Sequence, residues 1–307
     1  MFSYRKLIFI VSGLFILTGI AWIERQAIFN AVSQIQPTES VLSLSVLVAA
    51  NVFSAFLFAE IIQGRQRAPV SSSELAGIFL VAQSAKYVPG KVWSIVFQAS
   101  YLNRRVGTTL LTITNIDVSL ISMAVTAALG GSVILWLSTS PIAAIALMIA
   151  ALSATYIMAK RRILDQIAAW LLPRVTRSAF PPPMSDVPTT TQLRTMPFLS
   201  VLAGFAFAYL LGWSMFAGPA LGNGWSDGIL WTALIALSYV IGIASLFPAG
   251  IGVRELSMVG IAPFLGLDSD HAAGIAVLSR LILIAIDFAG IGVGAVLLLR
   301  DGRKTKC

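Results

Sequence analysis

Two short segments of this chain place charged residues beside a break formed by proline and glycine. The first reads Lys86-Tyr87-Val88-Pro89-Gly90-Lys91-Val92-Trp93. Because Pro89 lacks a backbone donor and Gly90 permits unusual backbone angles, a helix should break here. Lys86 and Lys91 flank the break, so the turn could offer both cations and free amide groups to an anion. The segment is therefore a candidate anion-binding turn.

The apolar runs on either side of this turn are much shorter than a membrane span. Leu75–Ala82 and Val92–Ala99 are each too short to cross a bilayer, which takes roughly 20 mostly apolar residues. We therefore expect two half-helices between Glu74 and Arg105 that enter and leave on the same side, with the broken backbone held by protein or by a wet cavity. The alternative is an amphipathic helix on the membrane surface, whose lysines reach out to the lipid headgroups.

The second segment repeats this pattern far along the chain and reads Ser245-Leu246-Phe247-Pro248-Ala249-Gly250-Ile251-Gly252-Val253-Arg254-Glu255. A helix should again end at a break, here formed by Pro248, Gly250 and Gly252. The charged residues Arg254 and Glu255 follow, and ionisable groups in such a setting are costly and are candidates for function. The alternative is structural, with the two charges neutralising each other.

Four further polar residues lie inside long apolar runs. Asn115 and Asp117 are close together in one run, and Arg280 and Asp287 lie seven residues apart in another. The second spacing puts Arg280 and Asp287 on the same helix face, two turns apart. Charges that face inward in a membrane protein pair with each other or line a polar cavity. A purely structural bridge from Arg280 to a carboxylate is the alternative.

The composition requires a membrane around these segments. Of the 307 residues, 57% are hydrophobic and 11% are charged, and the mean hydropathy is +0.87. A typical soluble domain has about 25% charged residues, so this chain cannot cover a water-facing surface. The net charge is +8, but the Lys and Arg residues sit in short clusters between apolar runs, which is typical of membrane topology and argues against nucleic-acid binding. The sequence therefore predicts an all-α integral membrane protein.

Seven apolar runs are long enough to cross a bilayer. They are Leu7–Ile23, Val41–Ile62, Leu110–Leu137, Ile142–Ala159, Phe198–Phe216, Ile229–Phe247 and Ala272–Leu299. By the positive-inside rule the basic clusters should all be cytoplasmic, and this orientation requires one more crossing between Phe247 and His271. We therefore predict about eight transmembrane helices, some of them broken or re-entrant, in a bacterial cytoplasmic (inner) membrane with both termini inside.

These elements divide the chain into four parts. The parts are a first transmembrane half (1–159), a cytoplasmic connector (160–197), a second and related transmembrane half (198–300) and a basic cytoplasmic tail (301–307). The broken segments lie near 74–105 in the first half and near 245–267 in the second. Within the connector, Ile163–Leu172 has the spacing of a short interfacial helix.

Cysteine and histidine exclude several kinds of chemistry. Cys307 is the only cysteine and His271 the only histidine, so no disulfide framework and no Cys/His metal site can form. We expect no cofactor. His271 lies in a short polar connection before an apolar helix, where Asp270 is the expected N-cap. A catalytic His271 would also need a nucleophile and an orienting partner.

The two broken segments, together with Arg280 in the last span, resemble the lysylphosphatidylglycerol synthase transmembrane-region family, also called flippase-like membrane proteins. The resemblance covers nearly the whole chain. Members resemble the lipid-translocating membrane half of the bacterial enzyme that makes aminoacylated phosphatidylglycerol, and others accompany glycosyltransferases that act on lipid-linked sugars. The synthase carries a soluble aminoacyl-transferase domain after its membrane part, whereas this sequence stops within eight residues of Leu299. The resemblance therefore implies the membrane module alone.

The resemblance implies a protein that binds or translocates a lipid with an anionic or sugar-bearing headgroup and is not an enzyme. The candidate headgroup residues are Lys86, Tyr87, Pro89, Gly90, Lys91, Trp93, Pro248, Gly250, Gly252, Arg254, Glu255 and Arg280, and the candidate intramembrane polar residues are Asn115, Asp117 and Asp287. The expected partners are membrane lipids and a glycosyltransferase for lipid-linked sugars. Two alternatives stay open: an integral-membrane transferase with a lipid-phosphate donor, and a non-catalytic partner of a glycosyltransferase.

Overall fold

The structure is a computed structural model that describes residues 36–66, 70–83, 93–102, 105–138, 140–160, 193–219, 224–245, 250 and 252–304. Within these residues the chain is all helical, with nine α-helices, one short 3₁₀ helix and no strand. Three predicted elements lie outside the described residues: the span Leu7–Ile23, the turn Lys86–Val92 and the connector helix Ile163–Leu172.

Six of the helices are long and apolar enough to cross a membrane. They are α3 (Pro37–Arg65), α6 (Thr108–Ser138), α7 (Pro141–Lys160), α9 (Thr195–Ala217), α10 (Trp225–Ala244) and α12 (Ser269–Lys304). Each of them overlaps one predicted span. The prediction of an all-α integral membrane protein is therefore confirmed for the part of the chain that the structure describes.

The helices begin and end at signals that lie beyond the apolar runs. Helix α3 begins at Pro37, four residues before the predicted start of the span, because proline fits the first turn of a helix, where no backbone donor is needed. Helix α10 ends at Ala244, three residues before the predicted end at Phe247. Leu246 and Phe247 lie outside the described residues, so the predicted end of this span stays a prediction.

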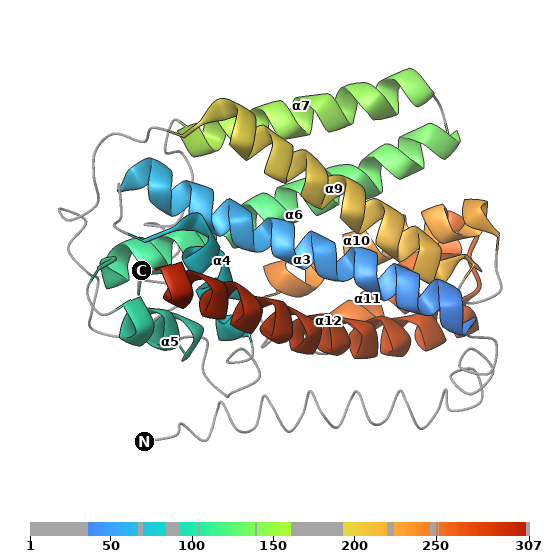
Figure 1. The fold of residues 1–307 in the computed structure, drawn as a ribbon. Coiled ribbons are helices and arrows are strands. Elements are labelled where there is room, and N and C mark those ends of the chain that lie inside the picture. Colours follow the sequence, from blue (N-terminus) through green and yellow to red (C-terminus); the bar gives the residue numbers. More distant parts are fainter. Residues whose placement is uncertain are drawn as a thin grey trace.

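The long helices lie side by side in an elongated bundle (Figure 1). Helices α3 and α9 pack closely because two glycines of α9 leave room for side chains of α3. A Cβ on Gly204 would come within 2.6 Å of the Phe53 ring, and a Cβ on Gly212 would come within 2.6 Å of Leu47. Small residues at such crossings are typical of helices that pack inside membranes.

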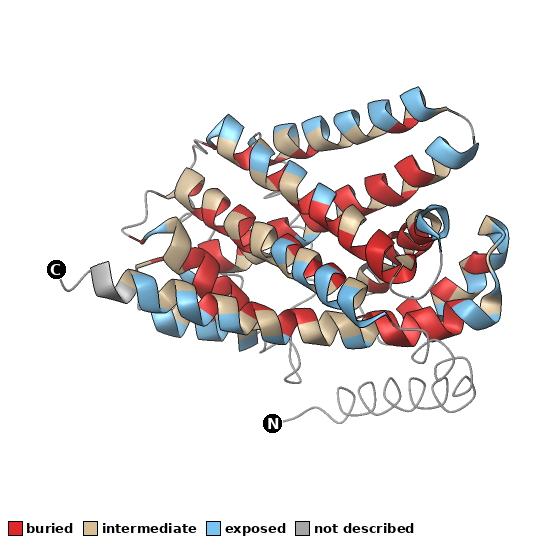
Figure 2. Ribbon diagram, turned by 45° about the vertical axis from the view of Figure 1, so that its right-hand side comes forward, coloured by how far each residue is buried: buried red, intermediate tan, exposed pale blue. Residues whose placement is uncertain are grey.

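The outside of the bundle is apolar over long stretches. Helix α7 and the outer side of α12 are largely exposed (Figure 2), and their exposed side chains include Ile142, Ile149, Phe288 and Leu299. Continuous apolar surface of this kind would be a liability in water but suits contact with lipid chains. The exposed faces therefore agree with the hydropathy of the spans.

Helix α4 (Ser72–Ala82) is short but lies deep inside the bundle, between α3 and α12. Its 11 residues rise only about 16 Å, roughly half the thickness of a bilayer core. The backbones of α4 and α12 touch, because Gly77 and Gly294 face each other: a Cβ on Gly294 would come within 2.8 Å of the Gly77 carbonyl oxygen. The alternative of an amphipathic helix on the membrane surface is therefore wrong for α4.

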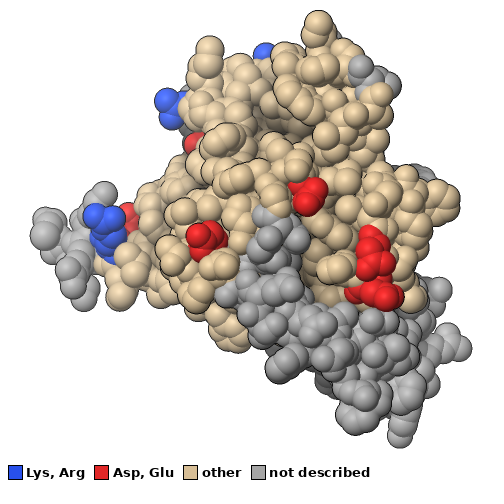
Figure 3. Space-filling model, turned by 90° about the vertical axis from the view of Figure 1, so that its right-hand side faces the viewer, with Lys and Arg blue, Asp and Glu red and all other residues tan. Residues whose placement is uncertain are grey.

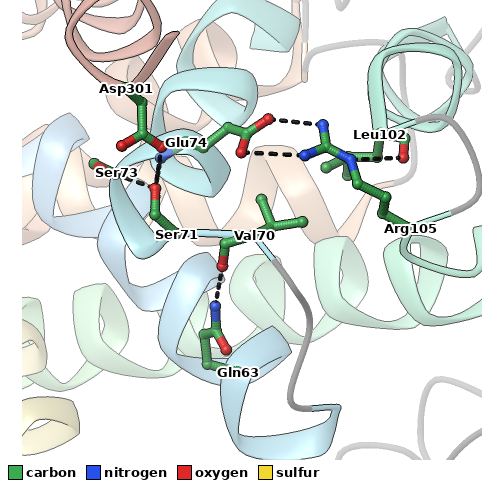
Figure 4. A network of polar contacts seen from close by, with 8 residues as sticks. All are labelled: Gln63, Val70, Ser71, Ser73, Glu74, Leu102, Arg105 and Asp301. Carbon is green, nitrogen blue, oxygen red and sulfur yellow. Dashed lines mark hydrogen bonds and ion pairs between the residues drawn. The ribbon is translucent and has the colours of Figure 1, made fainter. Parts of the chain in front are cut away.

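Helix α5 (Trp93–Leu102) brings the chain back to the end of the bundle where α4 begins (Figure 4). Arg105 forms two hydrogen bonds with the Glu74 carboxylate, at 2.7 and 3.4 Å. At the same place Ser71 accepts a hydrogen bond from the Glu74 backbone N–H, as an N-cap, and donates one to Asp301 of α12. The start of α4, the end of α5 and the end of α12 thus lie together.

The opposite end of the bundle is acidic (Figure 3). Glu39, Asp227 and Asp270 lie in the first turns of α3, α10 and α12. The N-cap of α12 is Asp268 and not Asp270 as predicted, because the helix starts two residues earlier than expected, at Ser269. Asp268 accepts hydrogen bonds from the backbone N–H of His271 at 3.2 Å and from its ring at 2.9 Å. These hydrogen bonds hold the pKa of the exposed Asp268 carboxyl below its ordinary value.

Candidate functional site

The candidate site lies where α11 (Val253–Ile261) starts after the second break. Gly250 and Gly252 have φ angles of +64° and +81°, which side chains other than glycine rarely adopt. Gly250 also lies against Gly242 of α10, where an added Cβ would come within 3.0 Å of the Gly242 Cα. The glycines therefore let the start of α11 pack directly on α10, and they hold Arg254 inside the bundle.

Glu255 is bound on both of its carboxylate oxygens. Its Oε2 accepts a hydrogen bond from the Gly252 backbone N–H at 2.8 Å, and its Oε1 accepts one from Arg280 Nη1 at 3.3 Å. The Glu255 side chain is 1% exposed. This carboxylate therefore caps the first turn of α11 and connects it to α12. The structural bridge from Arg280 to a carboxylate, the alternative given for Arg280, is present, and the carboxylate is that of Glu255.

Arg254 is buried and has much less hydrogen bonding than its neighbour. Its Nη2 donates to Ser279 Oγ at 3.2 Å, and its Nε has no hydrogen-bond partner among the described residues. No carboxylate of the described chain lies within ion-pair distance of Arg254, although Glu255, Arg280 and two tyrosines are within electrostatic reach. Glu255 forms its ion pair with Arg280 and acts on Arg254 electrostatically, so neutralisation of Arg254 by Glu255 involves no direct ion pair.

The tyrosines that approach Arg254 come from two further helices. They are Tyr209 of α9 and Tyr239 of α10. Phenol hydroxyls can donate to an anion or to a carboxylate. The sequence reasoning missed both tyrosines, because a tyrosine in an apolar run gives no signal of its own. Groups on α9, α10, α11 and α12 are therefore within electrostatic reach of Arg254.

A second buried polar centre joins α3 to α6. Arg65 Nη2 lies 2.5 Å from Asp117 Oδ2, and their side chains are 2% and 1% exposed. Arg65 Nη1 also donates to Thr114 Oγ1 at 3.3 Å. Arg65 belongs to one of the basic clusters that the positive-inside rule places in the cytoplasm, and the sequence gave Asp117 no partner. Arg65 is instead in the last turn of α3 and buried, because Asp117 lies at a matching depth in α6.

Asn115 and Asp117 belong to different contacts although they are two residues apart. The Asn115 amide donates to Gln98 Oε1 of α5 at 2.8 Å and accepts from Gln98 Nε2 at 3.4 Å. Residues two apart on a helix do not share a face, so Asn115 holds α5 whereas Asp117 holds α3.

The structure describes only some of the remaining candidate residues. Trp93 is the first residue of α5 and is 44% exposed. The described residues contain no group of three or more His, Cys, Asp or Glu side chains that could hold a metal ion. Five candidates of the first turn and one of the second lie outside the described residues: Lys86, Tyr87, Pro89, Gly90, Lys91 and Pro248.

The glycine at the start of α11 can be tested against a matched position. Gly250→Ala should destabilise the protein by more than Gly266→Ala, because Gly266 has a similar φ of +72° but no atom within 4 Å of an added Cβ. The backbone strain alone should cost about 1–2 kcal/mol, and contact with Gly242 adds to it. Thermal unfolding in detergent measures the difference, and equal losses for the two variants would argue against the close contact of α10 with α11.

The comparisons with known proteins add no relative. The chain matches no protein-family model and no curated protein.

Proposed function

We propose that this chain is a flippase-like membrane protein that binds, and moves across the membrane, a lipid with an anionic headgroup. The observation that carries this proposal is the excess positive charge at the start of α11, where Arg254 is buried without an ion-pairing carboxylate among the described residues. Burial of an uncompensated guanidinium is costly, so such a group is a candidate for function. The lipid phosphate supplies the missing negative charge.

The geometry around Arg254 suits a phosphate group. A guanidinium presents its N–H groups in a planar fork that can bind two phosphate oxygens at once, and such charge-assisted hydrogen bonds are strong. The first turn of a helix adds backbone N–H groups and a partial positive charge. At the start of α11 the Gly252 N–H already donates to Glu255. The N–H groups that follow it in the first turn are therefore the ones proposed to bind the phosphate.

The proposal includes a topology of about eight crossings in two related halves, in the cytoplasmic membrane. The contact of Glu74 with Arg105 supports a re-entrant first segment, because both ends of the segment lie at one end of the bundle (Figure 4). The exposed cations Lys160 and Arg300 end α7 and α12, whereas the opposite end is acidic. The positive-inside rule then places the basic end in the cytoplasm. Lys86 and Lys91 are included in the proposed headgroup site because they flank the Pro89-Gly90 break in the sequence.

The contacts of the carboxylates favour binding over catalysis. Asp117 and Glu255 are both engaged in ion pairs with arginines. A transferase with a lipid-phosphate donor would need a carboxylate that can reach a nucleophile and accept its proton, whereas Asp117 and Glu255 are occupied by their ion pairs. A non-catalytic scaffold for a glycosyltransferase would not need an uncompensated arginine inside its bundle.

The decisive experiment compares Arg254 variants in lipid binding. Purified protein should bind a soluble short-chain phosphatidylglycerol, and Arg254→Lys should weaken binding by roughly tenfold or more, because a lysine keeps the charge but loses the fork. Arg254→Ala should abolish saturable binding. Isothermal titration calorimetry measures the affinities, and Arg194→Lys, at an exposed arginine before α9, is the matched control.

Two further measurements separate the proposal from its alternatives. Reconstituted wild-type protein should move a fluorescent anionic lipid between the leaflets of a liposome, and Arg254→Ala should not. If Arg254→Lys and Arg254→Ala both bind and translocate like the wild type, the anion site at Arg254 does not exist. Translocation that needs an added glycosyltransferase would instead support the scaffold.

A further inference from the structure

Arg254 of α11 is held by residues of two neighbouring helices. Its Nη2 donates a hydrogen bond to Ser279 Oγ of α12 at 3.2 Å. At the other end of the side chain, Gly242 of α10 lies against the Arg254 Cβ, because a Cβ added to Gly242 would come within 3.2 Å of that atom. The base and the tip of the arginine side chain are therefore both held, although its Nε has no hydrogen-bond partner among the described residues.

The Ser279 hydroxyl can only accept a hydrogen bond from Arg254. A serine hydroxyl has one hydrogen to donate and two lone pairs, and the Ser279 hydroxyl donates to the Ala276 carbonyl oxygen at 2.8 Å. Ser279 is fully buried, so bulk water does not compete for its lone pairs. The backbone of α12 therefore sets the direction from which Ser279 accepts, and with it the orientation of the Arg254 guanidinium.

The neighbouring contact between the same two helices has a different character. Arg254 and Glu255 are adjacent on α11, and their partners Ser279 and Arg280 are adjacent on α12. In the contact of Glu255 with Arg280 a carboxylate compensates a guanidinium, whereas in the contact of Arg254 with Ser279 the acceptor is a neutral hydroxyl. Ser279 thus holds Arg254 without cancelling its positive charge.

We propose that Ser279 is a positioning residue of the anion site, an inference that rests on the proposed function. Ser279 orients the Arg254 guanidinium so that its Nε–H and its remaining N–H groups meet the lipid phosphate. Because the acceptor is neutral, the full positive charge of Arg254 is left for that phosphate. A carboxylate at the same position would also hold Arg254 but would take up its charge. The chemistry of position 279 therefore decides whether Arg254 binds an anion or only joins two helices.

Removal of the hydroxyl should weaken lipid binding. Ser279→Ala should bind short-chain phosphatidylglycerol roughly tenfold more weakly than the wild type, because the guanidinium loses the acceptor that orients it. Ser279→Thr keeps a hydroxyl and should recover most of the affinity. The matched control is Ser238→Ala, because Ser238 of α10 is equally buried and donates to the Ile235 carbonyl oxygen at 2.9 Å, with no side-chain partner among the described residues. This control should bind like the wild type, as measured by isothermal titration calorimetry on the folded proteins.

Ser279→Asp distinguishes positioning from structural support. The aspartate should pair with Arg254, so thermal unfolding in detergent should find this variant at least as stable as Ser279→Ala. A buried carboxylate is not foreign to α12, which already carries Asp287 at 5% exposure. Ser279→Asp should nevertheless show no saturable lipid binding, because its carboxylate takes the place of the phosphate. A residue that only supports the fold would give the opposite result, an affinity that follows the stability.

The possible failures of this inference and of the proposed function can be told apart. Wild-type affinity in Ser279→Ala, or an equal loss in Ser238→Ala, overturns the positioning role but leaves lipid binding at Arg254 intact. The same holds if Ser279→Asp binds the lipid as tightly as the wild type. If Ser279→Ala does not fold, the other two variants decide, because Ser279→Thr should bind and Ser279→Asp should not. Absence of saturable binding by the wild type overturns the proposed function and this inference together.

Discussion

Replacement of Asp117 by alanine should lower the free energy of unfolding by about 3–5 kcal/mol, the cost of removing one partner from a buried ion pair. Arg65 and Asp117 are 2.5 Å apart and almost fully buried, so water cannot replace the lost carboxylate. The hydrogen bond from Arg65 to Thr114 remains, but a neutral hydroxyl does not compensate a charge at this depth. Unfolding by SDS in detergent micelles measures the loss.

The Glu74–Arg105 pair is the matched control, because the Arg105 side chain is 38% exposed. Glu74→Ala should cost at most about 1 kcal/mol, as is usual for ion pairs in contact with water. The double variant Arg65→Met with Asp117→Leu should recover most of the stability lost in Asp117→Ala, because it removes both buried charges. Equal losses in Asp117→Ala and Glu74→Ala would contradict the burial of the Arg65–Asp117 pair.

Glu255→Gln should have a comparably large effect, and its effect should depend on the anions in solution. The variant removes the charge that pairs with Arg280 and that lies within electrostatic reach of Arg254, so we expect a loss of about 3 kcal/mol or more. An anionic lipid that binds Arg254 should restore part of this loss, because a ligand that binds only the folded state stabilises it. Thermal unfolding with and without short-chain phosphatidylglycerol measures both effects.

Arg280 provides the control for this experiment. Glu255→Gln combined with Arg280→Met removes one charge of each sign and should be more stable than Glu255→Gln alone. Arg254 keeps its charge in the double variant, so lipid should still stabilise the protein. If lipid raises the unfolding temperature of Glu255→Gln and of a variant that also carries Arg254→Ala to the same degree, the stabilisation does not come from Arg254.

The membrane character of the chain could be predicted from the sequence because it depends on runs of apolar residues that no tertiary contact can hide. Each described span was located, and the errors lie at the ends. Helix α10 ends at Ala244, and the α12 cap is Asp268 because capping depends on a shift of only two residues from Asp270. Signals of this kind act over a single turn, whereas hydropathy averages over a whole span.

The pairing of the buried charges could not be predicted, because it depends on how the helices are arranged. The adjacent residues Arg254 and Glu255 suggested a pair, yet Glu255 is bound to Arg280, 25 residues away along the chain. Asp117 was recognised as an unusual residue, but Arg65 is 52 residues earlier in the numbering and looked like part of a loop. Only a comparison of how deep each charged residue lies in the bundle could have suggested such partners.

The contact between Gly77 and Gly294 limits how this protein can change shape. With the two backbones in contact, a rotation of α4 about its own axis would drive Leu80 or Val81, which already border Gly294, into the backbone of α12. The two helices must therefore move as one rigid body. A transport cycle would have to bend elsewhere in the bundle. Cross-linking α4 to α12 should then leave the cycle running.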